Sequence, residues 1–254
     1  MHGPARVAPS PPGSQDARRV LAIEVLIVLS LSLLPSAVDA VFNLLQAPLA
    51  GIQVFVYANL PLLQQVADIL FSLAPVALVL HLAWRSGEGL EPFGLERPSL
   101  RRDAVPGVAL GAVVAAVGVA IYLVAVGLKV NRFVVPVPPL GHWWTIPVLA
   151  LGAIQAGLLE EVIVAGYLIR RLRQFGWTPP VAVAASALLR ASYHLYQGWG
   201  GFAGNLALGA LFGTIFVRTR RTWSLVVAHA SVDLLAGLGY IAFRGHCVLG
   251  ACIR

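Results

Sequence analysis

The chain has 254 residues, of which 58% are hydrophobic and only 11% are charged, and its formal net charge is +7. This composition excludes a disordered protein, which combines low hydrophobicity with high charge. It also argues against a soluble globular domain, in which about a quarter of the residues are charged. The basic residues stand in short runs, which is typical of membrane-protein loops and not of a nucleic-acid-binding face. Arginine far outnumbers lysine, and alanine and glycine are abundant, which favours a bacterial source and hence a bacterial plasma membrane.

Apolar windows long enough to cross a bilayer follow one another along the chain. A membrane span needs about 20 mainly apolar residues. Seven windows meet this requirement: roughly 20–42, 61–84, 104–128, 145–169, 179–197, 202–218 and 222–243. The sequence therefore predicts an all-α, polytopic membrane bundle with about seven transmembrane helices.

Composition divides the chain into four regions. Residues 1–19 are rich in Pro, Ser and Gly and are predicted to form a disordered tail. Residues 20–143 hold the first membrane helices and include a densely charged cytoplasmic linker at 85–103. Residues 144–243 hold most of the ionisable residues that lie within spans, and 244–254 form a C-terminal tail.

The placement of Lys and Arg predicts an inner N-terminus and an outer C-terminus. With this orientation the inner segments hold 13 of the 18 basic residues, the outer segments hold 4, and Arg190 lies within a span. Cytoplasmic loops carry such an excess of basic residues. A cleavable signal peptide is the weaker alternative, because Arg18 and Arg19 precede an apolar stretch. Glu24 interrupts that stretch, and the polar leader is long for a signal peptide.

Two adjacent glutamates, Glu160 and Glu161, lie in the middle of the predicted span 145–169. Charges inside a bilayer are costly and mark functional sites unless partners satisfy them. Adjacent helical residues point about 100° apart, so both side chains cannot face one small site equally. Two close carboxylates in a low dielectric need a shared proton or a cationic partner, which suits a general base. The alternative is a hydrogen-bonded pair that joins neighbouring helices.

The next spans carry two further pairs at helical spacing. Arg190 and His194 are four residues apart and share one helix face, with Tyr193 beside them. His229 and Asp233 have the same spacing, which allows the carboxylate to orient the imidazole. The structural alternatives are a histidine at the membrane interface at position 194 and a polar pair at 229 and 233 whose side chains hydrogen-bond only each other. Because all four follow the double glutamate, we favour a common functional site.

Small residues and one amide lie among these spans. Gly107 with Gly111, and Gly209 with Gly213, form two GxxxG pairs that permit close helix packing and carry no chemistry. Asn205 is a polar candidate either for the same site or for hydrogen bonding between helices.

The other ionisable residues within spans are interpreted as structural or interface-facing: Glu24, Asp39 and Asp68. Two cysteines, Cys247 and Cys252, lie in the predicted outer tail. A disulfide is permitted outside the cytoplasm, and two free thiols are the alternative. Neither cysteine has the spacing of a zinc or redox motif.

The order Glu-Glu, His, a Gly-rich span, then His-x-x-x-Asp resembles the CAAX protease and bacteriocin-processing (CPBP) family of intramembrane peptidases. The resemblance covers about residues 145–243. Glu160 and Glu161 match the family's EExxxR motif, but Ala165 stands in place of the arginine. His194 matches the histidine of FxxxH, but Arg190 stands in place of the aromatic residue. We therefore predict that Arg190 supplies the missing cation to Glu161 from the neighbouring helix.

The resemblance implies an endopeptidase without a cofactor, acting on membrane-associated proteins or peptides. Glu160 would be the general base for a water molecule, which His194 would help to hold. His229 and Asp233 would lie near the developing oxyanion. Glu161 would support the site together with Arg190, and Asn205 is a further supporting candidate. A zinc site formed by Glu160, His194 and His229 is the alternative, although no HExxH motif is present.

Two non-enzymatic interpretations remain open at this stage. Buried Glu, His, Asp and Arg residues could serve a proton-coupled transporter, although no repeated halves are visible. A degenerate, non-catalytic family relative could act as a membrane scaffold, because the motif arginine is replaced. The lipid bilayer and a peptide or membrane-protein substrate are the expected partners, with no nucleic acid.

Overall fold

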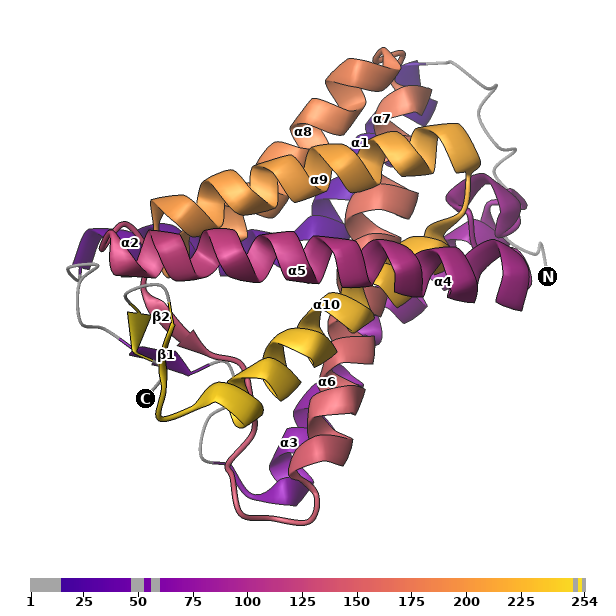
Figure 1. Cartoon of the computed structure of the whole chain (residues 1–254). Coiled ribbons are helices and arrows are strands. Elements are labelled where there is room, and N and C mark those ends of the chain that lie inside the picture. Colours follow the sequence, from indigo (N-terminus) through magenta and orange to yellow (C-terminus); the bar gives the residue numbers. More distant parts are fainter. Residues whose placement is uncertain (1–14, 47–52, 56–59, 249–250, 253–254) are drawn as a thin grey trace.

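A computed structural model describes residues 15–46, 53–55, 60–248 and 251–252, and helices make up most of it (Figure 1). The N-terminal part contains α1 (Gln15–Ser30), α2 (Leu33–Gln46), α3 (Leu62–Phe71), α4 (Ala74–Arg85) and α5 (Val105–Gly127). The C-terminal part contains α6 (Thr145–Glu160), α7 (Ile169–Gln174), α8 (Pro179–Tyr193), α9 (Trp199–Thr219) and α10 (Thr222–Phe243). The predicted all-α membrane architecture is confirmed.

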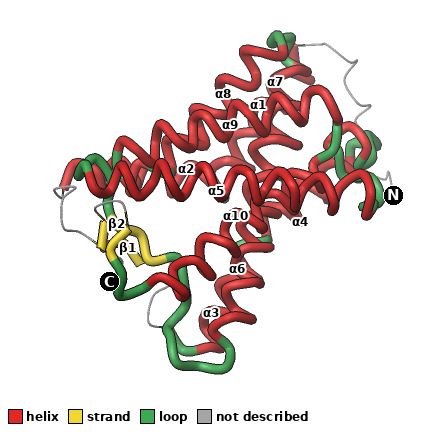
Figure 2. The backbone as a smooth tube through the Cα atoms, in the orientation of Figure 1, coloured by secondary structure: helices red, strands yellow, loops and turns green. Residues whose placement is uncertain are grey.

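Shorter elements connect these helices. Single helical turns form η1 (Glu91–Phe93) and η4 (Leu195–Gln197), and the wider π-helix forms η2 (Leu100–Ala104) and η3 (Glu161–Leu168). Strand β1 (Gln53–Phe55) pairs in parallel with β2 (Phe133–Val135), and β3 (Cys247–Val248) pairs antiparallel with β4 (Ala251–Cys252). Figure 2 shows these strands confined to one corner of the helical molecule. The side chains of the two cysteines, and with them the expected disulfide or thiols, lie outside the described part.

Within the described residues, five helical segments are long and apolar enough to cross a membrane. They are Leu62–Arg85, Leu100–Gly127, Thr145–Gln174, Trp199–Thr219 and Thr222–Phe243. A sixth candidate is the pair α1 and α2, which is bent by 53°. The fifth predicted window, 179–197, contains only the 15-residue α8 and is not among these candidates. At about 1.5 Å per residue, α8 is shorter than the roughly 30 Å hydrocarbon core. The described residues therefore contain five or six candidate spans, and the predicted count of seven is not confirmed.

The first predicted window differs from the structure at both ends and in the middle. Helix α1 begins at Gln15, so residues 15–19 of the predicted disordered tail are helical. Asp16 in its first turn favours this start, because acidic side chains interact well with a helix N-terminus. The break between α1 and α2 precedes Pro35, which the first turn of a helix tolerates but a helix interior does not.

The C-terminal helices pack closely on one another. Helix α10 packs against both α5 and α6, while α8 packs along α9 (Figure 1). One buried apolar cluster joins α7, α8, α9 and α10 around Phe212 and Phe216. A second cluster joins α1, α2 and α4 to η3 and to Phe93 of the linker. The helices that carry the candidate residues therefore share one core.

The basic loops that the sequence assigns to the inner side contact one another. Arg170 and Arg171 bind Glu88 of the linker between α4 and α5. Arg221, between α9 and α10, binds Asp103 and Glu96 of the same linker. These contacts bring α7, the α9–α10 connection and the linker together. The orientation of the termini stays a prediction.

Glycines set the closest approach between α5 and α10. A Cβ atom on Gly107 would lie 2.7 Å from the Ser224 carbonyl oxygen, and one on Gly111 would lie 2.6 Å from that of Ala228. In the second pair, a Cβ on Gly209 would lie 2.8 Å from the Cα of Ala187 in α8. The predicted packing role of the GxxxG pairs is therefore confirmed.

We expect Gly111→Ala to destabilise the protein by about 1–3 kcal/mol, because the added methyl forces α10 away next to His229. The thermal unfolding temperature of the purified protein in detergent measures this effect. Gly118→Ala is the matched control, because it lies on the same helix with no atom within 4 Å of the added Cβ. Equal unfolding temperatures for the two variants would contradict the assigned packing.

Candidate active site

A buried ionic cluster joins three of the predicted residues from three helical elements. The Arg190 Nη1 atom on α8 lies 2.7 Å from Glu161 Oε1 at the start of η3. The same carboxylate oxygen lies 2.7 Å from Nδ1 of His229 on α10. The Glu161 side chain is fully buried, and those of Arg190 and His229 are 1% and 8% exposed. The predicted contact between Arg190 and Glu161 is therefore present.

The Nδ1 atom of His229 lies between an acceptor and a donor. Glu161 accepts a hydrogen bond from a protonated Nδ1, whereas Arg190 Nη2, at 3.1 Å, donates to an unprotonated one. The Nε2 atom lies 3.5 Å from the Asp233 carboxylate, whose side chain is 41% exposed. The imidazole thus links a fully buried carboxylate to an accessible one.

The Glu160 carboxylate is held through one of its two oxygens. Its Oε2 atom accepts a 2.6 Å hydrogen bond from the Tyr193 hydroxyl and lies 3.4 Å from Arg190 Nη2. No described residue donates a hydrogen bond to its Oε1 atom, and its side chain is 14% exposed. Glu160 also interacts electrostatically with His194 and His229. One carboxylate oxygen is therefore fixed while the other can accept a proton.

His194 lies at the end of α8, beside the same cluster. Its Nδ1 atom lies 3.0 Å from the Arg190 carbonyl oxygen, and its ring centroid lies 4.7 Å from that of Tyr193. Tyr193 contacts Glu160 directly, and His194 interacts electrostatically with the same carboxylate, so His194 lies near the glutamates.

A change of helix type brings the two glutamates to one cation. Glu160 ends α6 and Glu161 begins the π-helical η3, in which every residue is buried. Such π-turns are frequent at functional sites. Both glutamates contact Arg190, but unequally, because Glu161 is fully buried and Glu160 is not. The expectation that they cannot face one site equally agrees with this arrangement.

Two motif positions lie outside the cluster, and one contributor was missed. The Asn205 amide donates to the carbonyl of Gly201 within its own helix. Ala165 is buried in the apolar cluster of α7 to α10. Tyr193 was noted only as a neighbour of His194, yet it binds Glu160. Its position one residue before His194 was the only signal available in the sequence.

The zinc alternative requires Glu160, His194 and His229 to bind one ion. Among the described residues, no group of three or more His, Cys, Asp or Glu side chains is placed to hold a metal ion. The Nδ1 atom of His229 and the carboxylate of Glu161 bind each other, and Arg190 places a positive charge against both glutamates. We therefore assign no step to a metal.

Comparison with known proteins identifies the segment that carries this cluster. Residues 142–235 match the family described as type II CAAX prenyl endopeptidase Rce1-like. We call these matched residues the Rce1-like segment, because their similarity to that family is what the comparison shows. The resemblance predicted from the sequence is thereby confirmed over these residues. No curated protein and no solved structure matches the chain.

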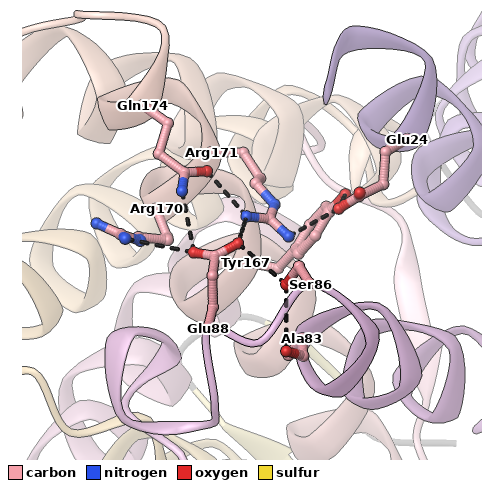
Figure 3. A network of polar contacts seen from close by, with 8 residues as sticks. All are labelled: Glu24, Ala83, Ser86, Glu88, Tyr167, Arg170, Arg171 and Gln174. Carbon is pink, nitrogen blue, oxygen red and sulfur yellow. Dashed lines mark hydrogen bonds and ion pairs between the residues drawn. The ribbon is translucent and has the colours of Figure 1, made fainter. Parts of the chain in front are cut away.

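A second polar network joins the Rce1-like segment to the preceding chain (Figure 3). Arg171, whose side chain is 1% exposed, lies 2.8 Å from Glu24 of α1 and also binds Glu88 of the linker. Glu88 accepts further hydrogen bonds from Arg170 and Gln174. Glu24 therefore has a structural partner, in agreement with its interpretation from the sequence.

We expect Arg190→Gln to lower stability by about 3–5 kcal/mol, because Glu161 would remain buried without its cation. The double variant with Glu161→Gln removes both charges and should lose less than the sum of the single variants. Unfolding in mixed detergent micelles measures these differences. Arg173→Gln, at an exposed position, is the control. Additive losses would contradict the direct coupling of Arg190 and Glu161.

The second network predicts a pH-dependent stability. Burial raises the pKa of Glu88, but the hydrogen bonds and charges of Arg171 and Arg170 outweigh burial and lower it below the ordinary value of 4.5. A carboxyl with a lowered folded-state pKa stabilises the protein above its unfolded pKa, and this stabilisation is lost as pH falls through the folded value.

We therefore expect Glu88→Gln to unfold at a lower temperature than the wild type at pH 7, with the gap narrowing below about pH 4.5. Unfolding temperatures between pH 7 and pH 3 measure the gap. Glu91→Gln makes the same charge change at an exposed position of the linker and should show no gap. A gap that stays constant with pH would contradict the ionic role of Glu88.

Proposed function

We propose that the protein is an intramembrane endopeptidase that hydrolyses peptide bonds of membrane-associated proteins or peptides in a bacterial plasma membrane. The observation that carries this proposal is the arrangement of Glu160, with one oxygen fixed by Tyr193 and the other available, beside a histidine that contacts two carboxylates. The Rce1-like match of this segment supports the same reaction class.

In the proposed reaction, the free Oε1 atom of Glu160 takes a proton from a water molecule that His194 helps to hold. The water oxygen attacks the peptide carbonyl carbon, and the carbonyl π electrons move to its oxygen. When this tetrahedral intermediate collapses, the carbon–nitrogen bond breaks and Glu160 returns the proton to the leaving amine. The products are a carboxylic acid and an amine.

His229 would stabilise the oxyanion of that intermediate. An ionised Asp233 accepts but cannot donate a hydrogen bond, so it would orient His229 or act in its protonated form. Donors that face developing negative charge are worth several kcal/mol in a water-poor site. Glu161 and Arg190 would hold the imidazole from the buried side.

We expect Glu160→Gln to reduce peptide cleavage by about 10²–10⁴-fold, because an amide cannot accept the water proton. The substrate is an internally quenched peptide that ends in a farnesylated CAAX sequence, compared with the same peptide without the lipid. Purified protein is assayed in detergent, and the unfolding temperature verifies that the variant is folded. Glu91→Gln, on the exposed linker, should keep the wild-type rate.

A wild-type rate in Glu160→Gln would overturn the assignment of the base and favour the non-catalytic relative or scaffold. The same assay decides the zinc alternative. We expect cleavage to survive complete removal of metal by a chelator, with no zinc bound to the active protein. Loss of cleavage in chelator that added zinc restores would instead support a zinc site at Glu160, His194 and His229.

A further inference from the structure

The linker between α4 and α5 packs directly on the continuous helical segment Thr145–Gln174, named here the rod, which carries the two glutamates. Glu88 binds Arg171, and the Phe93 ring stacks on that of Tyr167 with centroids 6.2 Å apart. The Arg171 guanidinium carbon lies 5.1 Å from the centroid of each ring. Figure 3 shows Arg171 between Glu88 and Glu24, with Tyr167 behind it. The rod is thus held at its end by charge and by ring stacking together.

The same linker binds the first turn of α10 through its backbone. The Thr222 hydroxyl donates to the Phe93 carbonyl at 2.7 Å, and the Thr222 amide donates to the Gly94 carbonyl at 2.9 Å. Gly94 has a φ of +69°, and a Cβ there would lie 2.7 Å from the Thr222 nitrogen. Gly166 of η3 packs against the same Phe93 carbonyl oxygen, because a Cβ added at Gly166 would lie 2.8 Å from it.

These contacts join the two halves of the candidate site through one short segment. Arg171 lies on the continuous rod Thr145–Gln174 with Glu160, and Thr222 lies about two helical turns before His229 on α10. Helices transmit displacements along their length, because their hydrogen bonds and packing make them stiff. The separation of the two helices at the linker therefore constrains the separation of Glu160 and His229.

We propose that Glu88, Phe93 and Gly94 form a positioning brace that sets the spacing between the carboxylate base and the oxyanion-binding histidine. This inference rests on the proposed function. The brace touches no reacting atom, and it lies outside the Rce1-like residues 142–235. A misplacement of about 1 Å in an active site can cost about 10²-fold in rate, so a small shift at the brace is expected to reach the reaction.

Two variants disturb the brace with little change in chemistry. Thr222→Val removes the hydrogen bond to Phe93 and keeps the side-chain shape. Gly94→Ala drives a methyl group into the Thr222 backbone. Gly89→Ala is its matched control, because Gly89 has a φ of +71° in the same linker but no atom within 4 Å of an added Cβ. Thr219→Val is the control for Thr222→Val, because Thr219 is exposed and its hydroxyl donates to the Ile215 carbonyl of its own helix and accepts from the Arg221 amide two residues on.

We measure kcat and KM on the farnesylated CAAX peptide, together with a spin-label distance between α6 and α10. The labels are placed at the exposed positions Leu151 of α6 and Leu235 of α10 after both cysteines are replaced by serine. We expect Thr222→Val and Gly94→Ala to lower kcat at least about tenfold with KM within about twofold, and to shift or broaden the distance. Both controls should match the parent protein.

An unchanged kcat or an unchanged distance in the two brace variants would overturn the brace. Equal effects from Gly89→Ala would also overturn it, because backbone strain alone would then explain the loss. If the parent protein cleaves no peptide, the proposed function fails separately. The distance measurement then still decides whether the brace sets the spacing of the helices.

Discussion

The burial of one guanidinium, that of Arg190, governs the arrangement of the candidate site. A buried charge is tolerated only when opposite charges and hydrogen bonds compensate for its lost hydration. Arg190 meets this requirement through Glu161 at 2.7 Å and Glu160 at 3.4 Å, both on the neighbouring rod. His229 completes the cluster by binding the same oxygen of Glu161. Burying any one of these charged groups without its partners would be energetically costly. Their ionic contacts therefore hold α8, α10 and the rod together.

The π-helical stretch η3 is the adjustment that makes this cluster possible within one continuous rod. A wider turn disturbs the usual backbone hydrogen bonds, and the surrounding elements must replace them. The Ser186 hydroxyl of α8 donates to the carbonyl of Val164 at 2.8 Å, and Phe93 of the linker covers Tyr167. The deviation from α-helix is thus supported from two sides, by the helix that carries Arg190 and by the linker.

The sequence predicted those features whose signal is local. The windows at 202–218 and 222–243 correspond to α9 and α10, because length and hydropathy alone define a span. The pairing of Arg190 with Glu161 followed from the cost of burying either charge. In contrast, hydropathy windows run through the bend after Ser30 and past the end of α8 at Tyr193, because apolar composition alone does not register where a helix breaks. The contact of Glu24 with Arg171 was also hidden, because these residues are 147 positions apart and nothing local connects them.

The three carboxylates of the cluster differ in solvent exposure, so the cluster has a buried side and an accessible side. Glu161 is fully buried, Glu160 is 14% exposed, and Asp233 is 41% exposed. A fully buried carboxylate is suited to hold Arg190 and His229, because water cannot compete for its hydrogen bonds. The more accessible carboxylates are the ones that water or a substrate can reach. In the proposed reaction, a peptide would approach from the side of α10 where Asp233 lies, and the imidazole of His229 would stand between the substrate and the buried ion pair. The contacts of His229 with both an accessible and an inaccessible carboxylate agree with this order.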